Sequence, residues 1–480
     1  MIAEKGKELT MSKSARTRLE RDSMGTMPVP AAAYYGASTQ RAVINFPISN
    51  LRLQRSFIRA LATIKLCAAE VNRQSHLLDR SKAAAIKRAA AEVAAGKFDD
   101  QMVVDVFQTG SGTSTNMNVN EVIASRAREL RGKSRNDRHD VHPNDDVNRG
   151  QSSNDVIPTA THIAALIEIN ERLVPALTHL LDSLRRKSAE FMPVVKTGRT
   201  HLQDATPIRL GQEFLGYAGQ VERALERLGY ASQRLSTVAL GGTAVGTGIN
   251  TRQDFAPRVC EQLSKRLKLT VSETSNHFQA QSSIDEIVNA SGELKTIAVS
   301  LLKIANDIRW LGSGPRAGFG ELVLPEVQPG SSIMPGKVNP VIAEAVCQVA
   351  ARVIGNDTTI TIAGQSGSFE LNVMQPIAAY CLLESIEILA AAVENFRVRC
   401  IDGIQATQRG PELVRNGLLL ATALVPAIGY DAAAAIAKEA AHTGQSIHAV
   451  AKRMTSLSDE QLDQLLDPQK MTQPDQPAAK

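Results

Sequence analysis

Aromatic residues are scarce in this chain of 480 residues, since one Trp, six Tyr and eleven Phe make up only 4% of it. The core must therefore be filled by Ala, Val, Ile and Leu, which suits closely packed helices better than aromatic-rich sheets. A large excess of one charge is also lacking. The 54 basic and 49 acidic residues leave a net charge of +5, and no basic block with interleaved aromatics marks a nucleic-acid face. We expect no nucleic-acid partner.

Paired cysteines are lacking as well. The five cysteines are odd in number and show no CxxC spacing, which argues against a zinc knuckle, a redox motif or a disulfide framework; they are Cys67, Cys260, Cys347, Cys381 and Cys400. No uninterrupted apolar run reaches the roughly 18 to 20 residues of a membrane helix, and the N-terminus lacks the apolar stretch of a signal peptide. We therefore expect a cytoplasmic protein with no membrane segment, in which residues 1–17 form a flexible arm.

What the chain does have is a seven-residue repeat of apolar side chains. One row holds Ile287, Leu294, Leu301 and Ile308, and a second holds Ala290, Ile297, Ile304 and Leu311. Two such rows form a seam of the coiled-coil kind and predict a single helix of about 25 residues, roughly 37 Å long at 1.5 Å per residue.

Three further stretches predict long helices. One runs from Ile163 to Leu184, where Pro175 should introduce a kink. Another begins at Asn339-Pro340, a good N-cap and first-turn pair, and should stop at Gly355-Asn356. The last spans residues 376–398. Together these stretches predict an all-α protein with a central bundle of long helices.

The segment GSSIMPGKVNP, Gly330–Pro340, carries the clearest chemistry between these helices. It is not a phosphate-binding loop, because five residues separate its glycines and Val338 follows Lys337 where Walker A needs Ser or Thr. Lys337 and the N–H groups of the following helix would make a seat for an anion such as a carboxylate. An ordinary capped loop accounts for the segment about as well.

Other inter-helix segments are dense in hydroxyl and amide side chains. Thr109–Asn120 lacks the GxGxxG spacing of a dinucleotide site, and residues 151–155 are similar in kind. Residues 198–204 add His201, which could act as an acid or base near neutral pH, although a lone His in such a loop is more often structural. The segment His142–Asp146 has no recognised metal-ligand spacing, so we expect no metal. This set suits a small anionic substrate and acid–base chemistry without a cofactor.

Taken together, the motifs resemble those of the aspartase/fumarase superfamily. The eleven residues of Gly330–Pro340 match its signature loop, and the other segments follow in the family's order: TGSGTSTNMNVNEV, HPNDDVNRGQSSNDVIPTATHIA, GRTHLQDATPIRLGQEF, GGTAVGTGIN and GSGPRAGFGEL. The resemblance covers the chain from about Arg18 to Gln461. Within the superfamily the chain is most similar to the class II fumarate hydratases, through Ser111, Ser153, Gly242 and residues 369–373.

The resemblance implies a three-domain, all-α aspartase/fumarase fold. The expected parts are an N-terminal helical domain over residues 1–150, a central long-helix bundle over 151–408, and a small C-terminal helical domain with a flexible tail over 409–480. It also implies a homotetramer whose active sites are shared between subunits. The implied reaction is the reversible anti addition of water to fumarate, giving (S)-malate, with no cofactor.

The resemblance also implies roles for individual residues. Ser331 would be the base that removes the C3 proton, and His201, tuned by Glu344, would belong to the acid/base site on the other face of the substrate. The substrate would be bound by Ser111, Gly112, Thr113, Ser152, Ser153, Asn154, Thr200, Ser332, Lys337 and Asn339. The secondary dicarboxylate site known in fumarases would be lined by His142, Asn144 and Asp145.

Some positions depart from the fumarase pattern. The residues before the central helix read Ser283-Ile284-Asp285-Glu286 where fumarases tend to show a His-Asp pair, and VIGNDTTITIAG is aspartase-like. Aspartate ammonia-lyase on the same scaffold is therefore the alternative. A non-catalytic helical scaffold would keep the seams but would not need Ser331, Lys337 and His201 together.

Overall fold

The computed structural model describes residues 16–474. These residues are mainly α-helical, and their strands form only two-stranded sheets, which confirms the all-α prediction. The chain divides into two compact units. The first contains the chain up to Arg172, Leu228–Leu294 and Gly355–Glu387, and the second contains Leu173–Arg227, Lys295–Ile354 and the chain from Ile388 onward. The arm expected over residues 1–17 lies outside the described residues except for its last two, and the domain boundaries near residues 150 and 408 stay a prediction.

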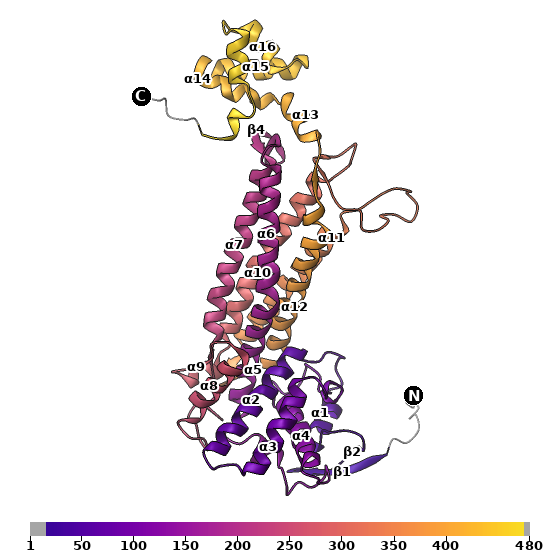
Figure 1. The fold of residues 1–480 in the computed structure, drawn as a ribbon, viewed down its shortest axis with the longest axis vertical. Helices are drawn as coiled ribbons and strands as arrows, with labels where there is room; N and C mark the ends of the chain where they lie inside the picture. Colours follow the sequence, from indigo (N-terminus) through magenta and orange to yellow (C-terminus); the bar gives the residue numbers. More distant parts are fainter. Residues whose placement is uncertain (1–15, 475–480) are drawn as a thin grey trace, which may run out of the picture. The chain divides into compact units, whose positions relative to one another are not determined.

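The first unit is built mainly from α-helices. They are α1 (Ala37–Asn45), α2 (Arg55–Gln74), α3 (Arg80–Ala94), α4 (Thr113–Leu130), α5 (Ser153–Glu168), α8 (Phe255–Leu267) and α9 (His277–Ser282). Its strands pair as β1 (Thr17–Asp22) with β2 (Gly25–Pro30), β5 (Thr237–Val238) with β6 (Ser272–Glu273), and β8 (Gly367–Ser368) with β9 (Leu371–Asn372). The β5–β6 pair is parallel and the other two are antiparallel. Figure 1 shows α1 to α4 gathered in the indigo part of this unit.

The scarcity of aromatics is visible in how α2 packs. This helix lies against α3, α5 and α8. Four of its eleven apolar residues are alanines, and three of these, Ala60, Ala62 and Ala68, are fully buried. On α3, Ala83 and Ala89 are fully buried as well. Small side chains let two helices approach closely while still excluding water, so the core of this unit needs few large rings.

Four long helices contribute residues to both units: α7 (Leu210–Leu235), α10 (Asp285–Leu311), α11 (Val341–Gly364) and α12 (Gln375–Arg399). The second unit adds α6 (Val174–Phe191), and Figure 1 shows these helices alongside one another there. Side-chain contacts connect them in the pairs Phe191 with Phe214, Tyr217 with Asp307, Asn306 with Cys347, and His179 with Glu394. All eight residues of the seven-residue repeat on α10 are buried, which confirms the predicted seam.

The predicted end of the helix after Asn339-Pro340 is wrong, because α11 runs on through Asn356 to Gly364. Asn356 is buried, and its Nδ2 donates hydrogen bonds to Glu384 Oε2 (2.7 Å) and Ser385 Oγ (3.0 Å) on α12. The next residue, Asp357, accepts a hydrogen bond from Ser291 Oγ on α10 (2.9 Å). These tertiary bonds outweigh the local preference of Gly-Asn for a helix end.

The stretch from Ile163 to Leu184 is helical throughout, as predicted. Its interruption is a π-helical turn, Ile169–Leu173, between α5 and α6, and Pro175 is the second residue of α6. The stretch Gln375–Gly403, which contains α12, is long and apolar enough by composition to cross a bilayer, but 61% of its most apolar window is buried inside the protein. A helix in the core of a protein can be equally long and apolar, so this helix is weak evidence for a membrane span.

The remaining helices of the second unit follow β10 (Gln405–Ala406), which pairs with β7 (Leu322–Val323). They are α13 (Arg409–Arg415), α14 (Val425–Ile428), α15 (Tyr430–Thr443), α16 (Ile447–Met454) and α17 (Asp459–Leu465), and most of them enclose a separate cluster around Leu424, Val450 and Leu462. Part of the tail expected to be flexible is held in place. Thr472 accepts a hydrogen bond from Arg209 Nε (2.9 Å) through Oγ1, and its carbonyl oxygen accepts one from Gln212 Nε2 (2.9 Å).

Candidate active site

Three hydroxyl groups of the first unit form a continuous chain, which we call the hydroxyl cluster: Ser111, Thr113 and Ser153. Thr113 Oγ1 lies 2.8 Å from Ser111 Oγ and 2.7 Å from Ser153 Oγ. Gly112 turns the backbone between the first two with a φ of +72°, and a Cβ there would come within 2.9 Å of Ile157 Cγ2. Glycine is therefore required at this turn by both conformation and space.

The hydroxyl cluster sits where two helices begin. Thr113 is the first residue of α4 and Ser153 the first residue of α5. Ser152 caps α5 through a reciprocal capping box with Asp155, and Asn154 Nδ2 donates a hydrogen bond to the carbonyl oxygen of Ala244 (2.8 Å). Helix N-termini present N–H groups and a partial positive charge. Two of them lie beside three hydroxyls, an arrangement that suits a carboxylate. The structure brings together the residues predicted to bind substrate in this part of the chain: Ser111, Gly112, Thr113, Ser152, Ser153 and Asn154.

Two buried charges beneath this cluster were missed by the sequence analysis. Asp155 and Lys65 are both fully buried. Burial raises the pKa of the Asp155 carboxyl to about 6 and lowers the pKa of the Lys65 ammonium to about 7. The available signal was Lys65 itself, an ionisable residue inside the otherwise apolar stretch IKLCAA.

The signature loop belongs to the second unit. Its ends are closed by hydrogen bonds from Gly330 N to the Lys337 carbonyl oxygen (2.7 Å) and from Asn339 Nδ2 to the Gly330 carbonyl oxygen (2.7 Å). At its start, Ser331 Oγ accepts hydrogen bonds from the backbone N–H groups of Ile333 (3.2 Å) and Met334 (3.0 Å). Ser332 and the Lys337 side chain are exposed.

Lys337, Asn339 and Glu344 line one pocket of about 390 Å³. The other side of the pocket is formed by the C-terminal end of α10 and the residues after it, including Asn306, Arg309 and Trp310. The structure thus brings together three predicted residues and adds a cation, Arg309, that the sequence analysis did not select. The only sequence signal was an Arg at the end of the repeat, next to the single Trp.

Thr200 and His201 lie at the tip of the hairpin formed by β3 (Val195–Thr200) and β4 (Gln203–Arg209). His201 and Leu202 form the two-residue turn with φ of +57° and +59°, which favours glycine or asparagine and is costly for these side chains. His201 is exposed, and among the described residues no hydrogen bond or ion pair joins it to Glu344. The structure of one chain does not bring this predicted pair together.

The base of the hairpin is held by a buried network of charges. Lys196 Nζ lies 2.7 Å from Glu213 Oε1 and 3.0 Å from Glu321 Oε2, and Arg199 Nη2 lies 2.6 Å from Glu321 Oε1. Burial raises the pKa of the Glu213 carboxyl, while the neighbouring Lys196 opposes that shift. The network fixes the strands whose tip carries His201.

The predicted secondary-site residues are adjacent in the first unit. His142 Nδ1 accepts hydrogen bonds from the backbone N–H groups of Asn144 (3.3 Å) and Asp145 (3.2 Å), and its Nε2 lies 3.0 Å from Arg138 Nη2. Burial lowers the pKa of the His142 imidazole. Among the described residues no group of three or more His, Cys, Asp or Glu side chains is placed to hold a metal ion.

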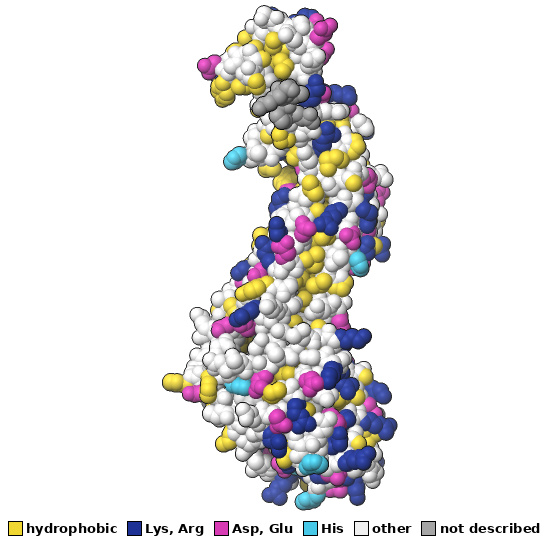
Figure 2. Space-filling model, turned by 60° about the vertical axis from the view of Figure 1, so that its left-hand side comes forward, with side chains coloured by type: hydrophobic (Ala, Val, Ile, Leu, Met, Phe, Trp, Pro, Cys, Tyr) yellow, Lys and Arg dark blue, Asp and Glu magenta, His cyan; other side chains and the backbone are white. Residues whose placement is uncertain are grey.

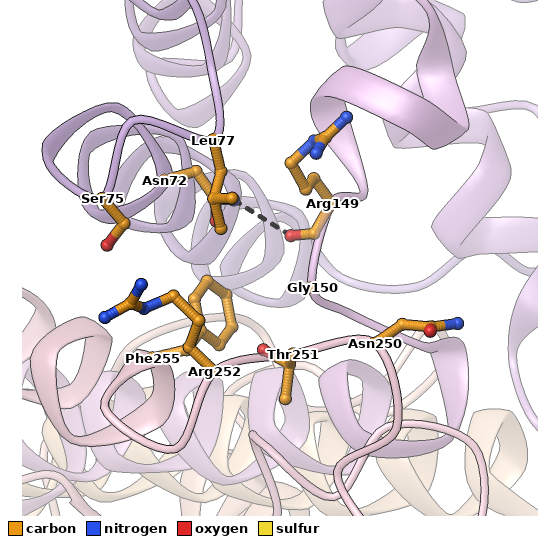
Figure 3. Close-up of a pocket in the computed structure, with 9 residues that line it drawn as sticks. All are labelled: Asn72, Ser75, Leu77, Arg149, Gly150, Asn250, Thr251, Arg252 and Phe255. Carbon is orange, nitrogen blue, oxygen red and sulfur yellow. Dashed lines mark hydrogen bonds between the residues drawn. The ribbon is translucent and has the colours of Figure 1, made fainter.

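A separate pocket of about 220 Å³ lies beside Gly150, just before the start of α5. Figure 3 shows Arg149 and Arg252 at this pocket with their guanidinium groups pointing away from each other. The backbone carbonyl of Arg149 accepts a hydrogen bond from Asn72 Nδ2 (3.0 Å), and Arg252 pairs with Asp254. The two cations therefore do not converge on a shared ligand.

Comparison with known proteins identifies the family. A family model described as Lyase matches residues 25–355, and one described as Fumarase C C-terminus matches residues 420–473. A class II fumarate hydratase of Bradyrhizobium diazoefficiens is 50% identical over 97% of this chain and 100% of that protein. Another, of Nitrosomonas europaea, is 50% identical over 95% of this chain and 99% of that protein.

Solved structures agree. The class II fumarase of Schistosoma mansoni matches with a TM-score of 0.93 at 38% identity, covering 95% of this chain and 99% of that one. The fumarate lyase/delta-crystallin of Brucella melitensis matches with a TM-score of 0.92 at 46% identity, covering 96% and 100%. The chain therefore belongs to the aspartase/fumarase superfamily of lyases. Within that superfamily it is of the class II fumarate hydratase, or fumarase C, type.

Proposed function

We propose that this chain catalyses the reversible anti addition of water to fumarate, giving (S)-malate. The observation that supports the proposal is the hydroxyl cluster at two helix N-termini, which suits the binding of a carboxylate. The chain that carries it is 50% identical to class II fumarate hydratases over almost its whole length. Hydration places OH on one alkene carbon and a proton on the other. In the first step the oxygen of water bonds to carbon while a base takes a proton from that water, and in the second an acid gives a proton to the other carbon. Side chains that accept and donate these two protons can catalyse the reaction without a cofactor.

The candidate residues divide the chemistry between them. In the direction of dehydration, Ser331 as an alkoxide takes the C3 proton of malate. On the other face of the substrate, the acid/base site that contains His201, whose basicity is tuned by Glu344, supplies the proton that leaves with the C2 hydroxyl as water. Removal of the C3 proton builds negative charge on the adjacent carboxylate, which Lys337 and Asn339 stabilise as it develops. The binding role extends to Thr200 and Ser332, while Ser111, Gly112, Thr113, Ser152, Ser153 and Asn154 hold carboxylate oxygens. His142, Asn144 and Asp145 form a secondary dicarboxylate site.

The working enzyme in this proposal is a cytoplasmic homotetramer with active sites shared between subunits. Figure 2 shows hydrophobic side chains exposed along the long helices, and Leu215, Val299 and Trp310 on α7 and α10 are each about half exposed. Apolar side chains on helices of this length are typical of a surface covered by another subunit. A second copy of the bundle supplies such a surface. A neighbouring chain would also supply His201 with the bonding partner that residues 16–474 of its own chain do not provide.

The proposed activity is tested by incubating purified protein with fumarate, with and without ammonium, and quantifying malate and aspartate. Malate is expected in both conditions, because water is the nucleophile. The matched control is the same incubation with the Ser331→Ala variant, which shows whether malate comes from this site or from a contaminating hydratase. Aspartate that forms only with ammonium, in the absence of malate, would instead establish the ammonia-lyase alternative.

A further inference from the structure

Asp155 joins two segments of the first unit that are far apart in sequence. Its Oδ1 accepts a hydrogen bond from the backbone N–H of Ser152 (2.9 Å) at the start of α5. Its Oδ2 accepts hydrogen bonds from the backbone N–H groups of Gly241 (3.1 Å) and Thr243 (2.9 Å). One buried carboxylate therefore satisfies three backbone donors, which places the segment Gly241–Ala244 against the N-terminus of α5.

The segment Gly241–Ala244 is held by further contacts in addition to its local backbone hydrogen bonds. Thr243 has a φ of +53°, a left-handed conformation that is costly for a threonine. The carbonyl oxygen of Thr243 accepts a hydrogen bond from Gln281 Nε2 (2.8 Å), and the carbonyl oxygen of Ala244 accepts the one from Asn154 Nδ2. Because Asn154 reaches this segment, any movement of the segment also moves a residue of the carboxylate seat.

Lys65 provides the opposite charge from α2. Its Nζ donates a hydrogen bond to Asn148 Oδ1 (2.7 Å), and Asn148 Nδ2 donates in turn to the carbonyl oxygen of Gln151 (3.0 Å), next to Ser152. Burial of each charge is unfavourable by itself. At Asp155 the hydrogen bonds from the three backbone N–H groups, followed by the charge of Lys65, partly offset the effect of burial. A buried carboxylate that accepts hydrogen bonds on both oxygens fixes its neighbours in one geometry.

We propose that Asp155, with Lys65 as its counter-charge, is a positioning residue that fixes Ser152–Asn154 and Gly241–Ala244 in the geometry that binds a substrate carboxylate. It acts through these neighbours and does not touch the substrate. This inference rests on the proposed function in one respect, namely that the hydroxyl cluster binds a dicarboxylate.

The test compares Asp155→Asn with a matched control, Glu121→Gln. Glu121 is also a buried carboxylate of the first unit, and it accepts hydrogen bonds from the backbone N–H groups of Gly36 (2.8 Å), Ser38 (3.1 Å) and Thr39 (3.2 Å) at the start of α1. Each amide variant keeps the shape of the side chain but turns an NH2 group towards backbone donors. Both variants should therefore lose a similar amount of thermal stability.

Substrate binding should separate the two variants. In Asp155→Asn we expect KM for fumarate, and the Kd for the non-reacting dicarboxylate succinate measured by calorimetry, to rise about tenfold or more, while kcat changes less than about threefold. Glu121→Gln should leave both constants within about twofold of wild type. An Asp155→Asn protein with unchanged KM and Kd overturns the proposal, and so does an equal rise in both variants. If the proposed function is wrong, the wild-type protein forms no malate. If only the role of Asp155 is wrong, the wild-type protein forms malate and the Kd for succinate is the same in Asp155→Asn as in wild type.

Two further measurements cover the case in which Asp155→Asn does not fold because Lys65 has lost its counter-charge. The double variant Lys65→Met with Asp155→Asn removes both charges and should show the same rise in Kd. In the wild-type protein, the amides of Gly241 and Thr243 should exchange hydrogen slowly although they lie in a glycine-rich loop, since their acceptor is buried. Fast exchange at both amides overturns the proposal without any variant.

Discussion

At the scale of single residues, the most demanding assignment is a serine acting as a base. A serine hydroxyl ionises far above neutral pH, so the alkoxide needs hydrogen bonds and positive charge that favour it over the neutral form. The turn around Ser331 supplies the first of these, because two backbone N–H groups, those of Ile333 and Met334, point at Ser331 Oγ. Lys337 in the same loop supplies a positive charge. Exclusion of water when the loop closes over substrate would strengthen both effects.

Ser331→Ala should therefore lower kcat by about 10²–10⁴-fold, the usual contribution of a positioned acid or base, with the fold intact by circular dichroism. Ser332→Ala is the matched control from the adjacent position. We expect it to change KM more than kcat, by less than about tenfold, because Ser332 is assigned to binding. Steady-state kinetics in both directions distinguish the two. A Ser331→Ala enzyme that keeps more than about a few per cent of wild-type kcat would show that another group removes the proton.

Residue types in a motif were enough to select the hydroxyl cluster and Lys337, but not the charges that support them. Asp155 reads as one more polar residue in QSSND, and nothing in the sequence places Gly241 and Thr243 beside it. Arg309 was overlooked for a similar reason, because it follows the apolar repeat of α10 and only the folded pocket shows it next to Lys337. Burial and long-range pairing decide such roles, and neither is a property of a local pattern.

At the scale of elements, a helix could be predicted correctly where its own sequence contains a periodic pattern of apolar residues. The seven-residue repeat of α10 specifies a buried face, and the whole face is buried. The prediction failed at the end of α11, where the local signal of Gly355-Asn356 competes with hydrogen bonds from Asn356 to α12. Local propensity is worth about 1 kcal/mol per residue, and a buried hydrogen-bonded side chain exceeds that.

The contact between α2 and α3 gives a prediction about pH. Glu70 on α2 pairs with Arg73 on the same helix (2.6 Å) and with Lys87 on α3 (2.6 Å). The hydrogen bond from Arg73, followed by the bond from Lys87, lowers the pKa of Glu70 from 4.5 to about 2. Because the folded pKa is lower than the unfolded one, the stabilisation is fully present above pH 4.5 and is lost as the pH falls towards 2.

Glu70→Gln should therefore lower the melting temperature at pH 7 by about 2 °C, and its difference from wild type should shrink as the pH falls from 4.5 towards 2. Thermal unfolding followed by circular dichroism across this range measures both effects. Glu261→Gln on α8 is the control, because Glu261 makes one exposed ion pair with Lys265 and should contribute little at any pH. A difference between Glu70→Gln and wild type that grows on acidification would contradict the assigned sign.

At the scale of the whole molecule, the candidate residues belong to both units, with the hydroxyl cluster in the first and Ser331, His201 and Glu344 in the second. His201 is exposed on a strained hairpin tip, and the described part of its own chain gives it no bond to Glu344. A costly conformation held at the tip of a rigid hairpin is expected where a side chain must reach a site elsewhere. If active sites are shared between subunits, the strained turn would place His201 in the active site of a neighbouring subunit.

Mixing two inactive variants tests this sharing directly. The Ser331→Ala and His201→Asn proteins, each expected to have little activity, are mixed in equal amounts, dissociated together in mild denaturant and reassembled. If Ser331 and His201 of one site come from different chains, each is intact with a probability of one half, so about a quarter of the sites, and of wild-type activity, should return. If both residues come from the same chain, every site keeps one defect and no activity returns. Native mass spectrometry of the mixture measures the oligomeric state and whether hybrid oligomers, expected to be tetramers, have formed. A mixture of the two variants that was never dissociated provides the baseline.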